Sequence, residues 1–370
     1  MRHILLFTSI CILTVFWILA PACPTAAQEA AEHAEKYSAR MRALSRAINR
    51  HYYDSASGLY QDPFHPDKGH RYTYVWPLAG MLQAENQISV VDSGNGGFRR
   101  AARALRPYLD KRSPAGYDAY LVSSGDKSRF YDDNEWIGLA MMDAYSRTGL
   151  RDYLDRAQMI YRFVASGFDE KAGGGIYWKE GDFSSKNTCS NGPAVLLALR
   201  LFAATRDSAY VGFATGIYEW VRTKLQAPSG LYYDNIQVRT GRIARHLYAY
   251  NTGTMLEASV MLYQLTGEDR YLQEARREAR SATEYFCGEG RFRDGFWFTA
   301  VLLRGFQRLA EVDKHPDYLR QFRVCTDYAL AHQVSSTGLM EKDGVPVDLV
   351  NQSGMLEILA RLADLERVDP

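Results

Sequence analysis

The chain has 370 residues, of which 46% are hydrophobic and 24% charged, so it holds enough apolar material for a large core in one or two domains. This composition excludes a disordered chain, a collagen and a coiled coil. Lys and Arg number 44 against 43 Asp and Glu, without a long block of one sign, so we expect no nucleic-acid-binding surface. Aromatic residues make up 13% of the chain, which favours a cleft lined with flat rings, as in sugar-binding sites, although packing between helices explains them equally well.

The N-terminal segment resembles an export signal. A basic start precedes an uncharged apolar run over 4–20, and small residues follow over 22–27. We therefore predict that residues 1–27 are a signal peptide and that the protein is exported to the periplasm or secreted. A single membrane span is the alternative, but the run is short for one and no basic cluster follows it. The residues around Cys23 also faintly resemble a lipoprotein box, in which this cysteine would carry a lipid anchor.

The cysteines and histidines give little functional information. The cysteines are too few and too scattered for a disulfide framework or a metal cage, although an oxidising compartment permits one bridge. They are Cys11, Cys23, Cys189, Cys287 and Cys325. No spacing of the histidines suggests zinc, so we expect neither a metal nor a cofactor.

An internal repeat predicts the architecture. Three polar turns share one spacing, with a Thr five residues before a Tyr, and the Thr residues are 57 and 61 residues apart. These pairs are Thr148 and Tyr153, Thr205 and Tyr210, and Thr266 and Tyr271. A mature chain of about 343 residues divided by a repeat of roughly 60 gives close to six helical hairpins.

Twelve helices are predicted directly from apolar periodicity, and strand patterns are nearly absent. The predicted helices span 35–53, 75–89, 96–110, 134–148, 151–166, 191–205, 208–224, 252–265, 269–285, 296–312, 316–333 and 351–366. The fold class is therefore all-α. Six hairpins can stack as an open solenoid or close into an (α/α)6 toroid, and periodicity does not separate these two arrangements.

Loop lengths indicate which face carries function. Connections inside a hairpin are short, whereas those between hairpins, such as 166–190 and 226–251, are long and rich in Gly, Trp, Tyr, Asn and Asp. The long loops should therefore gather at one end of the helices. We expect the functional site on that face.

Two adjacent carboxylates, Asp132 and Asp133, stand where a long loop meets a helix. They have a structural interpretation, because acidic residues cap helices and gain from the positive helix end. The catalytic interpretation is glycoside hydrolysis, in which a pair about 5 to 5.5 Å apart retains configuration and a pair about 6.5 to 9.5 Å apart inverts it. Adjacency favours retention. Since two such close groups do not both ionise cheaply, one can attack while the other holds a proton.

The chain resembles glycoside hydrolase family 76 from about Lys36 to His332, because four short motifs occur in that family's order. They are Tyr131-Asp132-Asp133-Asn134-x-Trp136, Gly174-Gly175-Ile176-x-Trp178, Lys186-Asn187-x3-Asn191, and Tyr250-Asn251-x-Gly253. The resemblance implies an (α/α)6 toroid of six hairpins forming one catalytic domain over 28–370. It also implies a retaining endo-α-1,6-mannanase with Asp132 as nucleophile and Asp133 as acid/base, acting on α-mannan or manno-oligosaccharides.

The candidate sugar ligands come from the same motifs, from the loops and from a later aromatic segment. They are Tyr131, Asn134, Trp136, Trp178, Lys186, Asn187, Asn191, Asp234, Tyr250, Asn251 and Trp297. Asp234 looks like a further acidic residue with which the family binds sugar hydroxyls. Each candidate also has a structural use, such as helix capping for the asparagines, an Asx turn for Asp234 and packing for the rings.

Two departures from the family pattern leave parts of the function open. Glu135, a single Trp136 and Ile137 stand where many members have Gly or Ala with paired Trp, and Leu303-Arg304 replaces Phe-Lys. The sequence does not separate endo from exo cleavage or predict whether branched mannan is accepted. A mannosyl transglycosidase and an exo-acting α-mannosidase are the alternative functions for the same site. An unsaturated-uronyl hydrolase and a non-catalytic glycan-binding protein are more distant alternatives. We expect a monomer.

Overall fold

The computed structural model describes residues 26–67 and 69–368. Residues 1–25 of the predicted signal peptide lie outside the described residues, and so do Cys11 and Cys23, so the predicted export and lipid anchor stay predictions. Among the described helices, none combines the length and the apolar character needed to cross a membrane.

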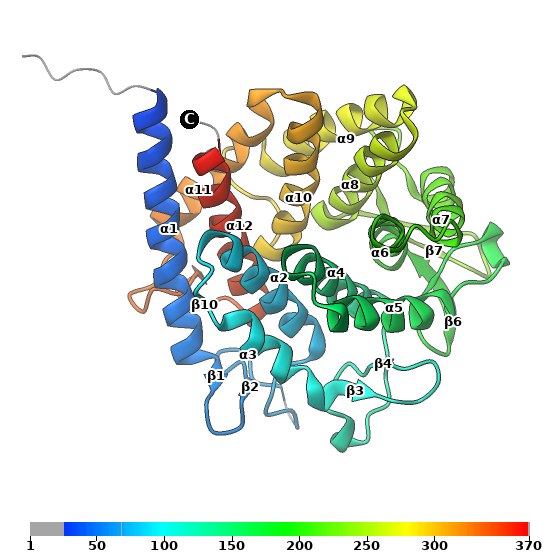
Figure 1. The fold of residues 1–370 in the computed structure, drawn as a ribbon, viewed down its shortest axis with the longest axis horizontal. Helices are drawn as coiled ribbons and strands as arrows, with labels where there is room; N and C mark the ends of the chain where they lie inside the picture. Colours follow the sequence, from blue (N-terminus) through cyan, green and yellow to red (C-terminus); the bar gives the residue numbers. More distant parts are fainter. Residues whose placement is uncertain (1–25, 68, 369–370) are drawn as a thin grey trace, which may run out of the picture.

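Six helices form a closed inner ring (Figure 1). They are α2 (Val75–Val91), α4 (Tyr131–Thr148), α6 (Thr188–Thr205), α8 (Ala249–Thr266), α10 (Phe296–Asp313) and α12 (Leu349–Val368). Each packs against the next, and α12 packs against α2, so the ring closes. The helices are therefore arranged as an (α/α)6 toroid and not as an open solenoid.

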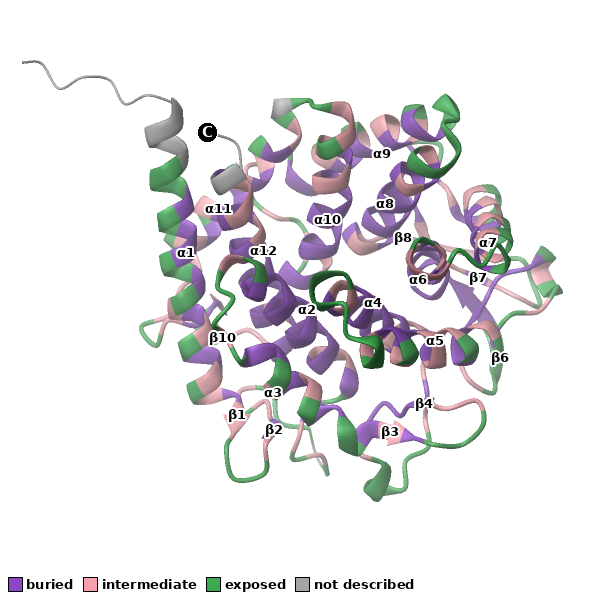
Figure 2. Cartoon of the chain, in the orientation of Figure 1, coloured by how far each residue is buried: buried purple, intermediate pink, exposed green. Residues whose placement is uncertain are grey.

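Six outer helices cover this ring. They are α1 (Ala26–His51), α3 (Gly97–Ala104), α5 (Arg151–Ala165), α7 (Ala209–Leu225), α9 (Asp269–Cys287) and α11 (Arg320–His332). The inner helices are buried around most of their circumference, whereas the outer helices bury one face and expose the other (Figure 2). The first outer helix, α1, packs on α12, so the two ends of the described chain meet in the same hairpin.

The three repeated turns join α4 to α5, α6 to α7 and α8 to α9 by the same hydrogen bonds. Each Thr hydroxyl donates to the carbonyl four residues earlier and accepts from the N–H two residues later. These contacts are Thr148 with Ala144 and Leu150, Thr205 with Leu201 and Asp207, and Thr266 with Leu262 and Glu268. The repeat predicted from the sequence is confirmed.

The all-α fold class is confirmed, and strands are a minor addition to the helices. The long loops contribute ten short strands to the described residues, and four of them form one antiparallel sheet in the order β5 (Tyr177–Lys179), β6 (Asp182–Asn187), β7 (Tyr233–Gln237) and β8 (Ile243–Leu247). Two-stranded hairpins pair β1 (Tyr53–Asp54) with β2 (Leu59–Tyr60), β3 (Leu109–Asp110) with β4 (Gly116–Tyr117), and β9 (Glu341–Lys342) with β10 (Val345–Pro346). These strands are too short and too polar to produce an alternating apolar pattern.

Several helix boundaries also differ from the predicted ones. The inner helices α4, α6 and α8 begin three residues early, at Tyr131, Thr188 and Ala249. The residues before them donate or accept no capping hydrogen bond through their side chains, so capping chemistry does not mark these starts. The predicted helix 96–110 ends at Ala104 and gives way to a 3-10 turn and a strand.

The fourth residue of three inner helices ties the preceding loop to the helix start. Asn134 and Asn191 are fully buried, and their side-chain amides bond both the N–H and the carbonyl of one loop residue, Tyr117 and Ile176 respectively, at 2.7 to 3.0 Å. Gln352 in α12 does the same with Met340. These amides extend the loop backbone pairing and hold the helix N-termini in place.

We expect Asn191→Ala to lower the free energy of unfolding by about 3 kcal/mol, because it leaves buried N–H and carbonyl groups of Ile176 without partners. Urea unfolding followed by circular dichroism measures this loss. The matched control is Asn235→Ala, whose partly exposed amide contacts only side chains, and we expect a change below about 1 kcal/mol there. Equal losses of unfolding free energy in both variants would mean that the bonds from Asn191 to Ile176 do not stabilise the fold.

A buried carboxyl between α8 and α9 makes stability depend on pH. Burial raises the pKa of Glu278 to about 8, although the hydroxyls of Tyr232 and Ser259 donate to it and lower that pKa. Between pH 4.5, its ordinary pKa, and pH 8 the folded chain keeps a proton that the unfolded chain releases. Stability is therefore lost as the pH rises through this window.

Glu278→Gln removes this ionisation while keeping the shape of the side chain. We expect the variant to match the wild type near pH 4.5 and to exceed its free energy of unfolding by about 1 to 3 kcal/mol at pH 7.5. Urea titrations at both pH values measure the difference. The exposed Glu268→Gln variant should follow the wild type, and a constant offset of Glu278→Gln at both pH values would refute the assignment.

Candidate active site

A cavity of about 890 Å³ opens on the face where the six inner helices begin. The second residue of every inner helix lines it, and so do most of the residues that directly precede these helices. The six second residues are Trp76, Asp132, Cys189, Tyr250, Trp297 and Val350. The repeat of the fold thus produces one ring of side chains around the cavity, whose volume falls in the range of small-molecule sites.

Asp132 is held by three hydrogen-bond donors. The indole N–H of Trp178 donates to Oδ2 at 3.0 Å, the thiol of Cys189 donates to the same oxygen at 3.2 Å, and the backbone N–H of Asp133 donates to Oδ1 at 2.9 Å. Burial raises the pKa of Asp132 to about 6, and these donors keep it from rising further. The positive ends of the converging helices also favour the ionised form.

Asp133 has a different environment. Among the residues the structure describes, no N–H, O–H or S–H donates to its carboxyl group. Burial and the adjacent charge of Asp132 raise the pKa of Asp133 well above its usual range. The first proton therefore leaves Asp132 while Asp133 keeps its own, and the two groups titrate as one coupled pair.

Aromatic rings form the floor and one rim of the cavity. Trp136 and Trp297 pack edge to face with centroids 4.9 Å apart, and Phe298 stacks on Tyr250 at 4.3 Å. Trp136 and Trp297 are only 2% and 1% exposed, so they close the floor. Trp178 is 40% exposed at the rim, where it offers an accessible ring face.

The predicted polar ligands Asp234 and Asn187 do line the cavity. Asp234 lies on β7, and the amide of Asn235 donates to its Oδ2 at 2.8 Å. Burial raises the pKa of Asp234. Asn187 ends β6 and accepts from the hydroxyl of Ser185 at 2.9 Å. The sheet formed by the two long loops therefore positions both side chains beside the carboxylate pair.

Five of the predicted sugar ligands do not line the cavity. The side-chain amides of Asn134 and Asn191 bond to the backbone of the preceding loops. Tyr131 stacks on Phe163 with ring centroids 4.9 Å apart. Asn251 is fully buried on α8, and its amide has no hydrogen-bond partner within the described ranges.

The fifth, Lys186, is a buried structural cation. Its ammonium group donates to the carboxylate of Asp169 at 2.6 Å and to the carbonyls of Asp169, Lys171 and Gly174 at 2.8 to 2.9 Å. The donors of an ammonium group are thereby satisfied. Lys186 holds the loop before β5 and does not line the cavity.

Sequence reasoning missed several residues that line the cavity, including Trp76, Cys189, Tyr248 and Phe298. The signal that could have found them is their position, since each stands within the first three residues of an inner helix or directly before one. Cys189 is free, as are the other cysteines of the described residues, Cys287 and Cys325.

The sequence is similar to those of known proteins. The model of glycosyl hydrolase family 76 matches residues 33–306. The mannan endo-1,6-alpha-mannosidase DCW1 of Saccharomyces cerevisiae is 29% identical over 198 residues, which cover 49% of this chain and 43% of that one. The matched region thus spans less than half the length of the curated yeast relatives.

Solved structures are similar over nearly the whole chain. The family 76 mannosidase Bt3792 of Bacteroides thetaiotaomicron has a TM-score of 0.78 at 25% identity and covers 90% of this chain and 100% of that one. An inactive variant of the α-1,6-mannanase GH76A of Salegentibacter sp., with two adjacent aspartates replaced by asparagine and α-1,6-mannotriose bound, has a TM-score of 0.75 at 28% identity, with coverage of 89% and 99%.

Proposed function

The chain belongs to glycoside hydrolase family 76, and on that premise we propose that it hydrolyses α-1,6-linked mannan inside the chain, with retention of configuration. The observation that carries the proposal is the adjacent carboxylate pair in the cavity, in which Asp132 accepts three hydrogen bonds and Asp133 accepts none from the described residues. The similar mannanase that was inactivated at two adjacent aspartates supports it.

In the first step, the carboxylate of Asp132 attacks the anomeric carbon while the bond from that carbon to the leaving oxygen breaks. Asp133 gives its proton to the leaving oxygen, so the departing sugar leaves neutral. The product is a mannosyl ester on Asp132. The donors Trp178 and Cys189 hold the attacking group in one orientation during this step.

The second step follows from the electrostatics of the pair. Ester formation removes the charge of Asp132, which was raising the pKa of Asp133. The carboxylate of Asp133 is thereby stabilised at the moment when it must accept a proton from water. The resulting hydroxide attacks the anomeric carbon, the ester bond breaks, and both groups return to their starting states.

The cavity suits a neutral oligosaccharide. The exposed ring of Trp178 offers a stacking face at the rim, and Asp234 and Asn187 offer acceptors for hydroxyl groups. A volume of about 890 Å³ accommodates several sugar units, which favours cleavage within a chain.

Incubation of the purified protein with linear α-1,6-mannan tests this function. We expect manno-oligosaccharides of several lengths, and proton NMR should detect the α-anomer first. Release of mannose alone would replace the endo assignment by an exo one, and a β-anomer appearing first would refute retention. Products enlarged by an added acceptor sugar would indicate transfer instead, and binding without cleavage would refute the enzyme assignment.

We also propose that residues 1–27 are an export signal and that 28–370 form one catalytic domain. The apolar run followed by small residues supports export. Mass spectrometry of the exported protein distinguishes a free N-terminus after Ala27 from an acylated Cys23.

A further inference from the structure

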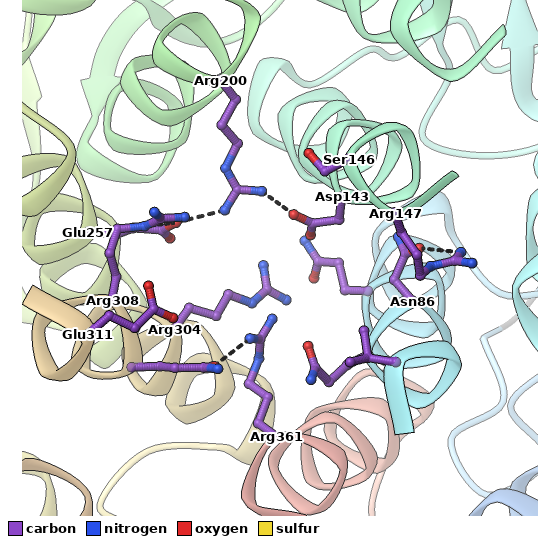
Figure 3. A pocket seen from close by; sticks show the side chains of 14 residues that line it. Asn86, Asp143, Ser146, Arg147, Arg200, Glu257, Arg304, Arg308, Glu311 and Arg361 are labelled. Carbon is purple, nitrogen blue, oxygen red and sulfur yellow. Dashed lines mark hydrogen bonds and ion pairs between the residues drawn. The ribbon is translucent and has the colours of Figure 1, made fainter. Parts of the chain in front are cut away.

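A second cavity, of about 430 Å³, lies among the later turns of the same six inner helices (Figure 3). Its lining is almost entirely polar and contains five guanidinium groups from four inner helices. These are Arg147, Arg200, Arg304, Arg308 and Arg361. Asp143, Glu257 and Glu311 are the carboxylates in the lining.

Each buried carboxylate at this cavity is shared by two arginines. Glu257 accepts from Arg200 at 2.7 Å and from Arg308 at 3.2 Å. Glu357, directly behind the lining, accepts two hydrogen bonds from Arg304 and one from Arg361 at 2.7 Å. Asp143 also accepts from Arg200, so five guanidinium groups stand against four carboxylates, those of Asp143, Glu257, Glu311 and Glu357.

Several N–H groups of these arginines remain without an acceptor. No described residue accepts from Nη1 of Arg304, from Nη2 of Arg361 or from either terminal nitrogen of Arg308. The buried Nε of Arg200 is also without a partner. Figure 3 shows the side chains of Arg200, Arg304 and Arg361 pointing from three helices toward the middle of the cavity.

We propose that this cavity binds a tetrahedral oxyanion of the phosphate or sulfate type. Guanidinium groups that converge on one cavity repel one another, and the buried Nε of Arg200 carries a desolvation cost because no described residue accepts from it. The negative ends of the inner helices help to tolerate the positive charge, but they supply no acceptor to the N–H groups named above. An oxyanion supplies both the opposite charge and the acceptors, in the geometry that guanidinium forks recognise.

The oxyanion site is separate from the sugar site. Gln83 lines the arginine cavity, while its side chain accepts from the indole of Trp297 at 3.2 Å and donates to the carbonyl of Trp136 at 3.3 Å. The two tryptophans form the floor of the sugar cavity, so a single layer of side chains divides the two spaces. Anion binding can therefore be measured without any sugar.

Calorimetric titration of the purified protein with sodium phosphate tests the proposal, with sodium chloride at matched ionic strength as the reference. We expect saturable binding of one phosphate per chain and no such binding of chloride. The variant Arg308→Gln, which leaves Glu257 paired with Arg200, should weaken phosphate binding about tenfold or more. Arg361→Gln, which leaves Glu357 paired with Arg304, should do the same.

The matched control is Arg291→Gln, which removes the same charge from an exposed side chain outside the cavity. It should bind phosphate like the wild type. Equal weakening in Arg308→Gln and Arg291→Gln would overturn the proposal, as would binding that never saturates, because phosphate stabilises proteins non-specifically. Repeating the titration on the variant Asp132→Asn, Asp133→Asn keeps this outcome independent of mannan hydrolysis.

Discussion

Replacement of either carboxyl, Asp132→Asn or Asp133→Asn, is expected to lower kcat on linear α-1,6-mannan by about a hundredfold to ten-thousandfold, the range that a positioned acid/base group supplies. The first variant loses the nucleophile. The second loses the proton that the leaving sugar needs. Reducing-end release from mannan measures both effects.

The two variants should differ on a substrate with a good leaving group. An aryl α-mannoside with an acidic phenol needs no proton to depart, so Asp133→Asn should still form the mannosyl ester, whereas Asp132→Asn should not. Added azide should accelerate turnover by Asp133→Asn and give an α-mannosyl azide. The matched control is Asp155→Asn on the exposed face of α5, which should keep wild-type activity. Unchanged turnover in the double variant would end the assignment.

Removal of the donors to Asp132 should move the acid limb of the pH profile. The hydrogen bonds from Trp178 and Cys189 lower the pKa of Asp132, so without them its pKa rises above about 6 and less of it is ionised at a given pH. We expect Trp178→Phe and Cys189→Ala each to shift the acid limb of kcat/KM to higher pH and to lower kcat/KM at pH 6 by about tenfold to a hundredfold.

The chain offers matched controls for both substitutions. Trp220 lies outside the cavity and donates its indole N–H to the carbonyl of Ala172. Cys325 is a buried free thiol that also lies outside the cavity. Trp220→Phe and Cys325→Ala should cost stability but leave the acid limb in place. An acid limb that stays at the wild-type pH in Trp178→Phe and Cys189→Ala would mean that these donors do not control the nucleophile.

The sequence alone predicted those features that depend on interactions between residues close together in the chain. The Thr of each repeated turn bonds to neighbours within four residues, so its spacing predicted the hairpins and their number. The pair Asp132 and Asp133 was likewise recognisable because adjacency alone keeps two carboxyl groups close.

Tertiary contacts decided which candidates face the cavity. Successive residues of a helix point about 100° apart, so a helix start misplaced by three residues assigns the wrong side chains to the pocket. Asn191 and Lys186 were predicted to bind sugar, yet their side chains donate hydrogen bonds to carbonyl groups of the loop. Cys189 looked uninformative, yet ring closure brings its thiol to Asp132, 57 residues away. Hydrogen bonds between neighbouring residues can be predicted from the sequence. The direction of a side chain depends on residues distant in the sequence, which only the closed ring of helices brings together.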